Sequence, residues 1–582
     1  LDVLLAYEDP RPMGRFRVAI ALLVAMSAFS MHQSAAFLFS SAGLLTTEGA
    51  RAIAARGQFD DVIQPGLWTL LQYPAGTSWS SLHFWDSPLA VHLHLALLYV
   101  ACLGLALGTW TRYAKWAAFV VYSALWSRNM LSFGGEQVLF IALLMLCLSD
   151  CGAACSLDAR GRPLRAIPRW PRVLLVLQLI PIYLGNALAK DGLTWIKGHA
   201  VHFAATTSAC GRFALWERAD ALAPVFWLAN HLTLYFEFGF ALVVLRALAE
   251  LSGPTRPPTR ASRAVVLALC GLAGALFVHD YAPVVRLGVP EVFGLLGGVA
   301  IAIVARRALA TALGRRVFSW VSAPRLWIPL GVLFHVGVFA ALSVDVFVLA
   351  TAAYYLLLTG GDPALTRPRP ALPARALELV DVVGVLIASG LVLAFTPWLW
   401  APMMIACLVA MIARARARGV PRRAVLVPAF CALHVAGALL WCLPREPALT
   451  DARARVTRPF TAWIKLTHGY QSWQMFAPNT STREGFLVAL GETDDGSIAP
   501  IFEIPATPTA DERPVLGREK REKILRRLAW ESDAAARPWF ARYLCREAPP
   551  ELRAVSLARR SFAALPFGAR ESTEARRRRF ER

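Results

Sequence analysis

Long stretches without a charged side chain are the feature that most constrains the fold of this chain. Residues 264–278 and 424–443 are two such stretches, and both are rich in Ala, Leu and Val. A helix of about 20 apolar residues matches the roughly 30 Å hydrocarbon core of a bilayer. The stretches also lack the period-2 alternation of outer-membrane strands, so helices are the spanning structure that fits them. The sequence therefore predicts an all-α polytopic membrane protein.

About thirteen transmembrane helices are expected from these stretches. The first is interpreted as a spanning helix rather than a cleavable signal peptide, because it is long enough to cross. We divide the chain into a transmembrane domain (residues 1–360), additional transmembrane helices (361–445) and a C-terminal extension (446–582). The spans are placed near residues 16–39, 89–109, 113–131, 135–150, 170–189, 223–249, 264–282, 289–305, 326–342, 344–360, 379–396, 398–413 and 424–443.

Lys and Arg residues concentrate in alternate loops, and this predicts the orientation. The opposite loops are poorer in them, so the positive-inside rule puts the N-terminus in the cytoplasm. An odd number of spans then makes the extension extracytoplasmic. Abundant Ala and Arg suggest a GC-rich bacterial genome, so the expected location is the bacterial inner membrane. The rich loops lie before residue 18 and near residues 112–115, 160–169, 256–263, 306–316, 367–375 and 414–423.

The net charge of +21 invites a nucleic-acid interpretation, for which Arg576 to Arg579 are the best local support. Most arginines, however, separate hydrophobic spans and act as orientation signals. We therefore expect membrane lipids as partners and no nucleic acid. Cys151 and Cys155 have neither a second cysteine pair nor a nearby histidine, so no metal site is predicted.

The C-terminal extension is expected to be a small α+β structure. Residues 485–504 predict a hairpin that turns at Asp494-Asp495-Gly496, since Asp-Gly is a favoured pair in tight turns. Residues 518–530 and 534–545 look helical, and the Arg-rich end is predicted to be disordered.

Four polar clusters could carry chemistry. Glu237 is the clearest, because ionisable groups at membrane depth are costly and usually line a cavity or a polar path. The alternative for Glu237 is a carboxylate paired to a Lys, Arg or His for helix packing. The clusters are Asn129 with Gly134, Gly135 and Glu136; residues 190–199; Asn230, His231 and Glu237; and the intramembrane histidines His92, His94, His279, His335 and His434.

Lys190 follows the fifth predicted span and permits two interpretations. A lysine at the end of a span commonly extends its amine to the interface. Alternatively, apolar surroundings would desolvate the amine and lower its pKa, so that it could act as a general base near neutral pH.

Three segments resemble the HTTM family (horizontally transferred transmembrane domain), which includes vitamin K-dependent gamma-carboxylase. One contains Tyr183, Lys190, Trp195 and Gly198, in the pattern of the carboxylase segment that carries the lysine base. Another runs from Trp126 to Ala159. The third, Gln471-Ser472-Trp473-Gln474-Met475-Phe476-Ala477-Pro478, resembles the QxWxMFAP box of many bacterial members; we call these residues the tail box.

The resemblance implies roles for individual residues. Lys190 would be the base that deprotonates a reduced quinone, with oxygen chemistry following, and Trp195 and Gly198 would form its scaffold. Glu237 matches an acidic position in the next span. His335 resembles the later intramembrane histidine of the family, with His279 as a competing placement. Asn129 and Glu136 are expected to contribute to ligand binding.

Departures from the family argue against carboxylation of glutamate. Asn129 stands where the carboxylase has a catalytic histidine, and an amide cannot exchange a proton as imidazole does. The large luminal substrate-binding domain is also not recognisable. The resemblance thus implies a membrane protein that binds a quinone or another lipid-like ligand in an outward-facing cavity. The alternatives are a transporter or lipid translocator, or a scaffold acting through its exported tail.

Overall fold

The computed structural model describes most of the bundle and much of the C-terminal extension. The described residues are 2–50, 80–128, 134–207, 210–252, 290–365, 409, 413, 422–441, 464, 467, 473, 475–503, 519–529, 531–572 and 574–576.

Helices dominate the described residues, as predicted. Their boundaries follow local capping: the helix beginning at Pro88 has Ser87 as its N-cap, whose side chain accepts a hydrogen bond from the amide of Ala90, and Gly108 ends it with φ of 70°. The longer helices are α2 (Arg11–His32), α5 (Pro88–Leu107), α6 (Thr111–Arg128), α7 (Gly134–Cys147), α8 (Trp170–Ile180), α12 (Ala219–Ser252), α14 (Pro290–Ala310), α15 (Ala312–Val321), α16 (Pro324–Ala341) and α20 (Arg423–Trp441). The shorter ones are α1 (Asp2–Leu5), α3 (Ala35–Phe39), α9 (Asn186–Leu188), α10 (Leu193–Ile196), α11 (Ala200–Thr206) and α17 (Phe347–Ala353).

Five helical segments among the described residues are long and apolar enough to cross a membrane. Three shorter apolar helices, Gly134–Cys147, Phe347–Leu358 and Leu426–Ala438, accompany them. The predicted spans at 264–282 and 379–396, and almost all of 398–413, lie outside the described residues. The five segments are Arg11–His32, Pro88–Leu107, Trp170–Leu188, Leu215–Leu248 and Ala312–Ala341.

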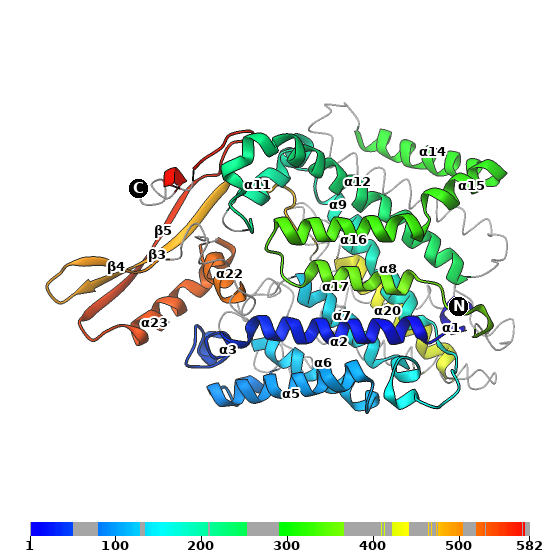
Figure 1. Ribbon diagram of the computed structural model, residues 1–582, viewed down its shortest axis with the longest axis horizontal. Coiled ribbons are helices and arrows are strands. Elements are labelled where there is room, and N and C mark those ends of the chain that lie inside the picture. Colours follow the sequence, from blue (N-terminus) through cyan, green and yellow to red (C-terminus); the bar gives the residue numbers. More distant parts are fainter. Residues whose placement is uncertain are drawn as a thin grey trace.

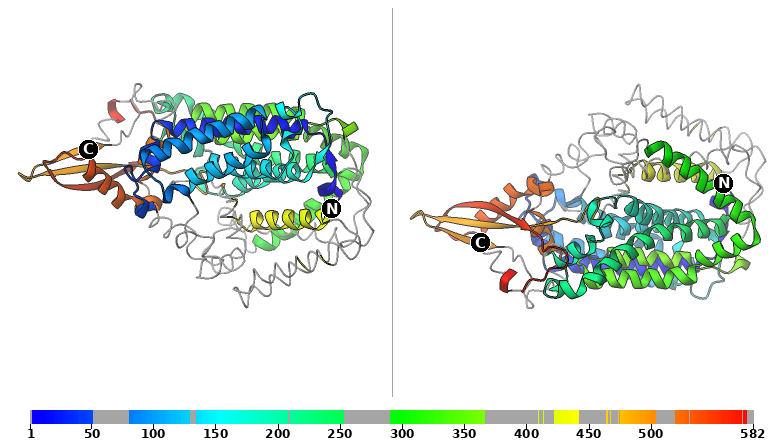
Figure 2. Two further views of the ribbon diagram at one scale, coloured as in Figure 1. Left: turned by 90° about the horizontal axis from the view of Figure 1, so that it is seen from below. Right: turned by 90° about the horizontal axis from the view of Figure 1, so that it is seen from above.

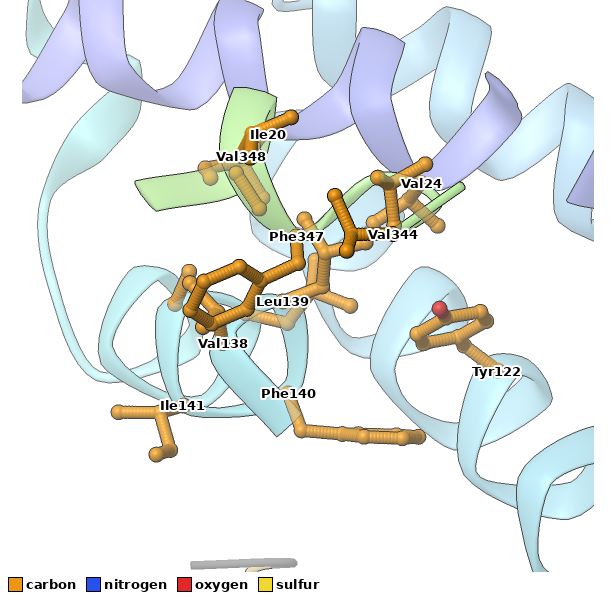
Figure 3. Packing of buried hydrophobic residues seen from close by; sticks show 14 of the residues in the cluster. Ile20, Val24, Tyr122, Val138, Leu139, Phe140, Ile141, Val344, Phe347 and Val348 are labelled. Atoms are coloured by element: carbon orange, nitrogen blue, oxygen red, sulfur yellow. The ribbon is translucent and has the colours of Figure 1, made fainter. Parts of the chain in front are cut away.

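The helices pack side by side into one elongated bundle (Figures 1 and 2). Its apolar core joins α2, α6, α7 and α17, which contribute Ile20, Tyr122, Phe140 and Phe347 respectively (Figure 3). The rings of Tyr122 and Phe140 stack with centroids 4.7 Å apart. Such burial of apolar side chains from four helices fixes how the helices pack, because close-packed interiors tolerate few alternative arrangements.

The C-terminal extension forms a three-stranded antiparallel sheet in the order β4-β3-β5. The strands are β3 (Arg483–Thr493), β4 (Ile498–Glu503) and β5 (Leu552–Ala563), and a two-residue pair joins β1 (Tyr7–Glu8) to β2 (Ile167–Pro168). The hairpin predicted around Asp-Gly is confirmed, with Gly496 at φ of 80° in its turn. Both predicted helices are also present, as α22 (Glu519–Arg527) and α23 (Arg537–Glu547).

One feature of the extension differs from the prediction. Strand β5 was not expected, and it pairs with the whole length of β3. Of the Arg-rich end, the structure describes Arg576, whose buried guanidinium donates to both carboxylate oxygens of Glu484 at 2.6 Å, and residues 577–582 lie outside the described residues. The sheet projects from the end of the bundle opposite the N-terminus (Figure 1).

Candidate functional site

Lys190 lies just after α9 and forms an ion pair with Glu237 of α12. The ammonium nitrogen Nζ donates to Oε1 of Glu237 at 2.6 Å and to Oε2 at 2.7 Å. Both residues are buried, with exposed fractions of 3% for Lys190 and 4% for Glu237. Lys190 therefore turns inward to Glu237 rather than extending its amine to the surface of the bundle, and these two predicted site residues are in direct contact.

Asn186 and Trp195 complete the surroundings of this pair. The side-chain amide of Asn186 donates to Oε1 of Glu237 at 2.9 Å, and the amine of Lys190 lies 4.5 Å from the centre of the Trp195 ring. The segment that carries Asn186 and Lys190 is reached through a π-helical turn, Pro181–Gly185, between α8 and α9. Such turns shift the register of the side chains that follow and are frequent at functional sites.

Two opposing effects act on the ionisation of Lys190. Burial disfavours the charged ammonium, whereas the carboxylate of Glu237 and its two hydrogen bonds favour it. Water is largely excluded, so the two groups depend on each other for compensation of their charges. A proton can pass between Nζ and a carboxylate oxygen along an existing hydrogen bond, which makes the pair a suitable acceptor for a proton from a third group.

His335 on α16 belongs to a neighbouring network. Its Nε2 lies 2.8 Å from the hydroxyl of Tyr183, which is also hydrogen-bonded to the hydroxyl of Tyr355. A Cβ added to Gly331, one turn before His335, would lie 2.5 Å from the Tyr355 hydroxyl, so only glycine leaves room for that ring. The sequence singled out Tyr183 and His335 but not Tyr355, which carries no motif.

The two networks share helices. Tyr183 and Asn186 lie on one continuous helical segment, which ends at Leu188 just before Lys190, and the aromatic rings of Phe236 and Phe240 on α12 pack against Tyr183. Helix α12 thus supplies both the carboxylate that pairs with Lys190 and two rings that pack against Tyr183. The resulting site consists of titratable side chains embedded among aromatic rings.

The tail box contacts the loop that follows Lys190. The amide of Gly192 donates to the Pro478 carbonyl at 3.1 Å, and the indole of Trp195 donates to the Phe476 carbonyl at 2.8 Å. A Cβ on Gly192 would lie 2.3 Å from that Pro478 oxygen, so this approach requires glycine. The extension is thus bonded to the segment that holds the Lys190 site.

Asn479, directly after the tail box, adds the side-chain contacts. Its Oδ1 accepts from the amide of Thr194 at 3.0 Å and from the Thr194 hydroxyl at 3.2 Å. The Thr194 hydroxyl in turn accepts from the amide of Thr480 at 3.1 Å. Sequence reasoning missed Asn479, because nothing in the local pattern around an isolated Asn indicates a partner 285 residues away.

Gly198 has a structural role in this loop. Its φ is 79°, and a Cβ there would lie 2.4 Å from the Trp227 ring. Nearby, Asn230 on α12 donates to the Trp195 carbonyl at 2.9 Å and accepts from the amide of Ala200 at 3.1 Å. These contacts hold the loop and Trp195 against α12.

The remaining predicted residues occupy different places. Glu136 is buried in the first turn of α7, where Gly135 lies against Phe347 of α17. Asn129 and His279 lie outside the described residues. Lys190, Glu237 and Trp195 are thus brought together, and His335 lies in the adjoining network.

No group of three or more His, Cys, Asp and Glu side chains suited to a metal ion occurs within the part of the chain that the structure describes. Comparison of the chain with protein-family models, with curated proteins and with solved structures gave no match.

Proposed function

We propose that this protein is a multi-pass membrane protein of the HTTM type that binds a lipophilic ligand with an acidic hydroxyl group, such as a reduced quinone. The observation that carries the proposal is the buried Lys190–Glu237 ion pair. A buried ion pair is costly to desolvate and commonly adds little to stability. A role in chemistry or binding therefore explains its presence better.

The arrangement of the chain supports a bilayer setting. Five apolar segments among the described residues are long enough to span, and the sheet projects from the end opposite the N-terminus. These segments support a membrane protein, and the alternating basic loops of the sequence favour a bacterial inner membrane, a cytoplasmic N-terminus and an extracytoplasmic extension; about thirteen spans are expected from the sequence alone.

The side chains around the Lys190–Glu237 ion pair suit such a ligand. A reduced quinone would supply an acidic hydroxyl group and a planar ring. Lys190 and Glu237 offer a titratable pair, and the Trp195 ring offers an aromatic surface 4.5 Å from the amine. Asn186 holds one oxygen of Glu237 and so keeps the carboxylate oriented toward the amine.

Lys190 and Glu237 would handle the proton together. Glu237 takes one proton from the ammonium of Lys190 and becomes a neutral carboxylic acid, which leaves Lys190 as a neutral amine. The amine then accepts the proton of the ligand hydroxyl at Nζ. The pair ends one proton richer and the ligand one proton poorer, so charge and atoms balance without an oxidant.

Mass spectrometry of lipids and quinones that co-purify with gently solubilised protein tests the proposal. Wild type should retain an enriched quinone or related lipid, and Lys190→Ala should lose it. Lys197→Ala is the matched control, because Lys197 lies in the same loop but is exposed. If none of the three proteins retains an enriched species, or if all retain it equally, the proposal fails.

A carrier is the second candidate, and the hydrogen-bonded set Tyr183, His335 and Tyr355 favours it. Linked titratable groups within a bundle can form a path for protons or polar substrates. Substrate-driven counterflow in proteoliposomes that is abolished by His335→Phe would support a carrier. If no lipid or polar substrate gave counterflow, the carrier hypothesis would be rejected.

A further inference from the structure

An unbalanced run of basic residues surrounds α15. Residues 292–344 contain no Asp or Glu but include five arginines: Arg306, Arg307, Arg315, Arg316 and Arg325. The first four side chains are exposed on the end of α14 and on α15. The sequence of this segment therefore carries a local excess of positive charge.

Helix α15 also presents an exposed apolar stripe. Leu313, Val317 and Trp320 recur at the helical spacing, and their exposed fractions are 72%, 51% and 72%. At 100° per residue these three side chains share one face, with Arg316 beside them and Arg315 farther round. Such an amphipathic helix, with a tryptophan on its apolar face and an arginine next to that face, suits the boundary between acyl chains and headgroups.

Neighbouring helices hold α15 in place. Thr311 caps its N-terminus by accepting from the amide of Gly314 at 2.9 Å. At the other end, Arg246 of α12 donates to the Ser319 carbonyl and the Trp327 indole of α16 donates to the Val321 carbonyl. These contacts use the C-terminal part of α15 and leave the apolar stripe facing outward.

Helix α15 is separate from the spanning helix that follows it. Ala323, with ψ of 124°, interrupts the helical backbone between α15 and α16. The 18 residues of α16 extend about 27 Å at 1.5 Å per residue, so α16 is long enough to cross without α15. Figure 1 places α14 and α15 at the same end of the bundle as the N-terminus. Alternation of the basic loops puts that end in the cytoplasm.

We propose that α15 lies in the cytoplasmic interface of the membrane and, with the end of α14, binds the headgroups of anionic phospholipids. Leu313, Val317 and Trp320 insert toward the acyl chains, while Arg306, Arg307, Arg315 and Arg316 lie at the level of the phosphates. Clusters of four or more basic residues beside a transmembrane helix favour anionic lipids by charge, and apolar insertion adds to the affinity.

The test uses full-length protein and lipid vesicles. Protein in detergent is titrated with phosphatidylglycerol or phosphatidylcholine, and retained lipid is counted by native mass spectrometry. Wild type should prefer phosphatidylglycerol, and Arg315→Gln/Arg316→Gln should bind it about 30-fold more weakly at low salt. The matched control is Arg559→Gln/Arg560→Gln, which removes the same charge from exposed positions of β5 in the extension.

Equal binding of the two lipids by wild type would overturn the proposal, and so would an equal loss in the control variant. Hydrogen exchange of residues 311–322 in reconstituted vesicles gives a second readout that does not depend on a variant. Exchange should be slower when the vesicles contain phosphatidylglycerol than when they contain phosphatidylcholine alone. Raising the salt concentration should reduce this difference, since headgroup attraction is screened.

Discussion

Replacing Asn479 with Ala should release the extension from the loop that follows Lys190. The side-chain oxygen of Asn479 accepts two hydrogen bonds from Thr194, one from its amide and one from its hydroxyl. Each such bond contributes about 1 kcal/mol, and leaving the partly buried Thr194 amide without an acceptor adds about 1 kcal/mol. The docking equilibrium should therefore shift by about 2–3 kcal/mol, which corresponds to roughly 30- to 150-fold.

Hydrogen exchange would measure this shift directly. In wild type, the amides of Gly192 and Thr194 donate to Pro478 and Asn479 and should exchange slowly. In Asn479→Ala both should exchange at least tenfold faster, and Lys190 should become more reactive toward an amine-modifying reagent. Asn479→Asp should behave like wild type, because a carboxylate also accepts both bonds.

Ser481→Ala is the matched control. The Ser481 hydroxyl is bonded within its own segment, to the backbone of Arg483, so its loss should leave the loop after Lys190 unchanged. Unaltered protection of Gly192 and Thr194 in Asn479→Ala would refute the reasoning, since it would mean that the extension does not hold this loop.

Three further results are expected. Lys190→Met should lower the free energy of unfolding by about 3–5 kcal/mol, because Glu237 would be left buried without a cation. Thermal denaturation should show that Lys190→Met/Glu237→Leu recovers most of this loss. A Lys190→Met variant as stable as wild type would contradict this reasoning. Gly198→Ala should destabilise the folded protein by about 1–3 kcal/mol, because alanine disfavours the left-handed backbone at this position and its Cβ would clash with Trp227. An unchanged melting temperature would count against this conformation of Gly198. Burial lowers the pKa of His202, whose Nε2 donates to the Leu565 carbonyl of the C-terminal segment at 3.0 Å, below its ordinary 6.5. Because the folded protein binds a proton at His202 less readily than the unfolded chain does, His202 favours the folded state above pH 6.5, and this contribution is lost as the pH falls. Proteolysis of the C-terminal segment should therefore accelerate between pH 6.5 and 5 in wild type but not in His202→Phe.

Much of the candidate site was visible in the sequence as single residues. Glu237 stands out because a carboxylate in an apolar helix is expensive, and Lys190 stands out because it ends an apolar span. Tyr355 and Asn479 were not visible, because a tyrosine in an apolar helix and an Asn in a loop are ordinary. Their importance comes from the atoms that they meet, which no local pattern encodes.

The sequence by itself determined the helical architecture, the apolar segments and the hairpin at Gly496. These features follow from interactions between residues close along the chain: 3.6-residue periodicity, uninterrupted apolar stretches and turn-forming pairs. Tertiary structure alone decided that Lys190 bonds to Glu237, 47 residues away, and that the tail box reaches Trp195, 281 residues from Phe476. It also decided that β5 joins β3. Long-range pairings depend on how whole helices and strands pack, and many packings are compatible with the same local pattern until side-chain shape and charge select one.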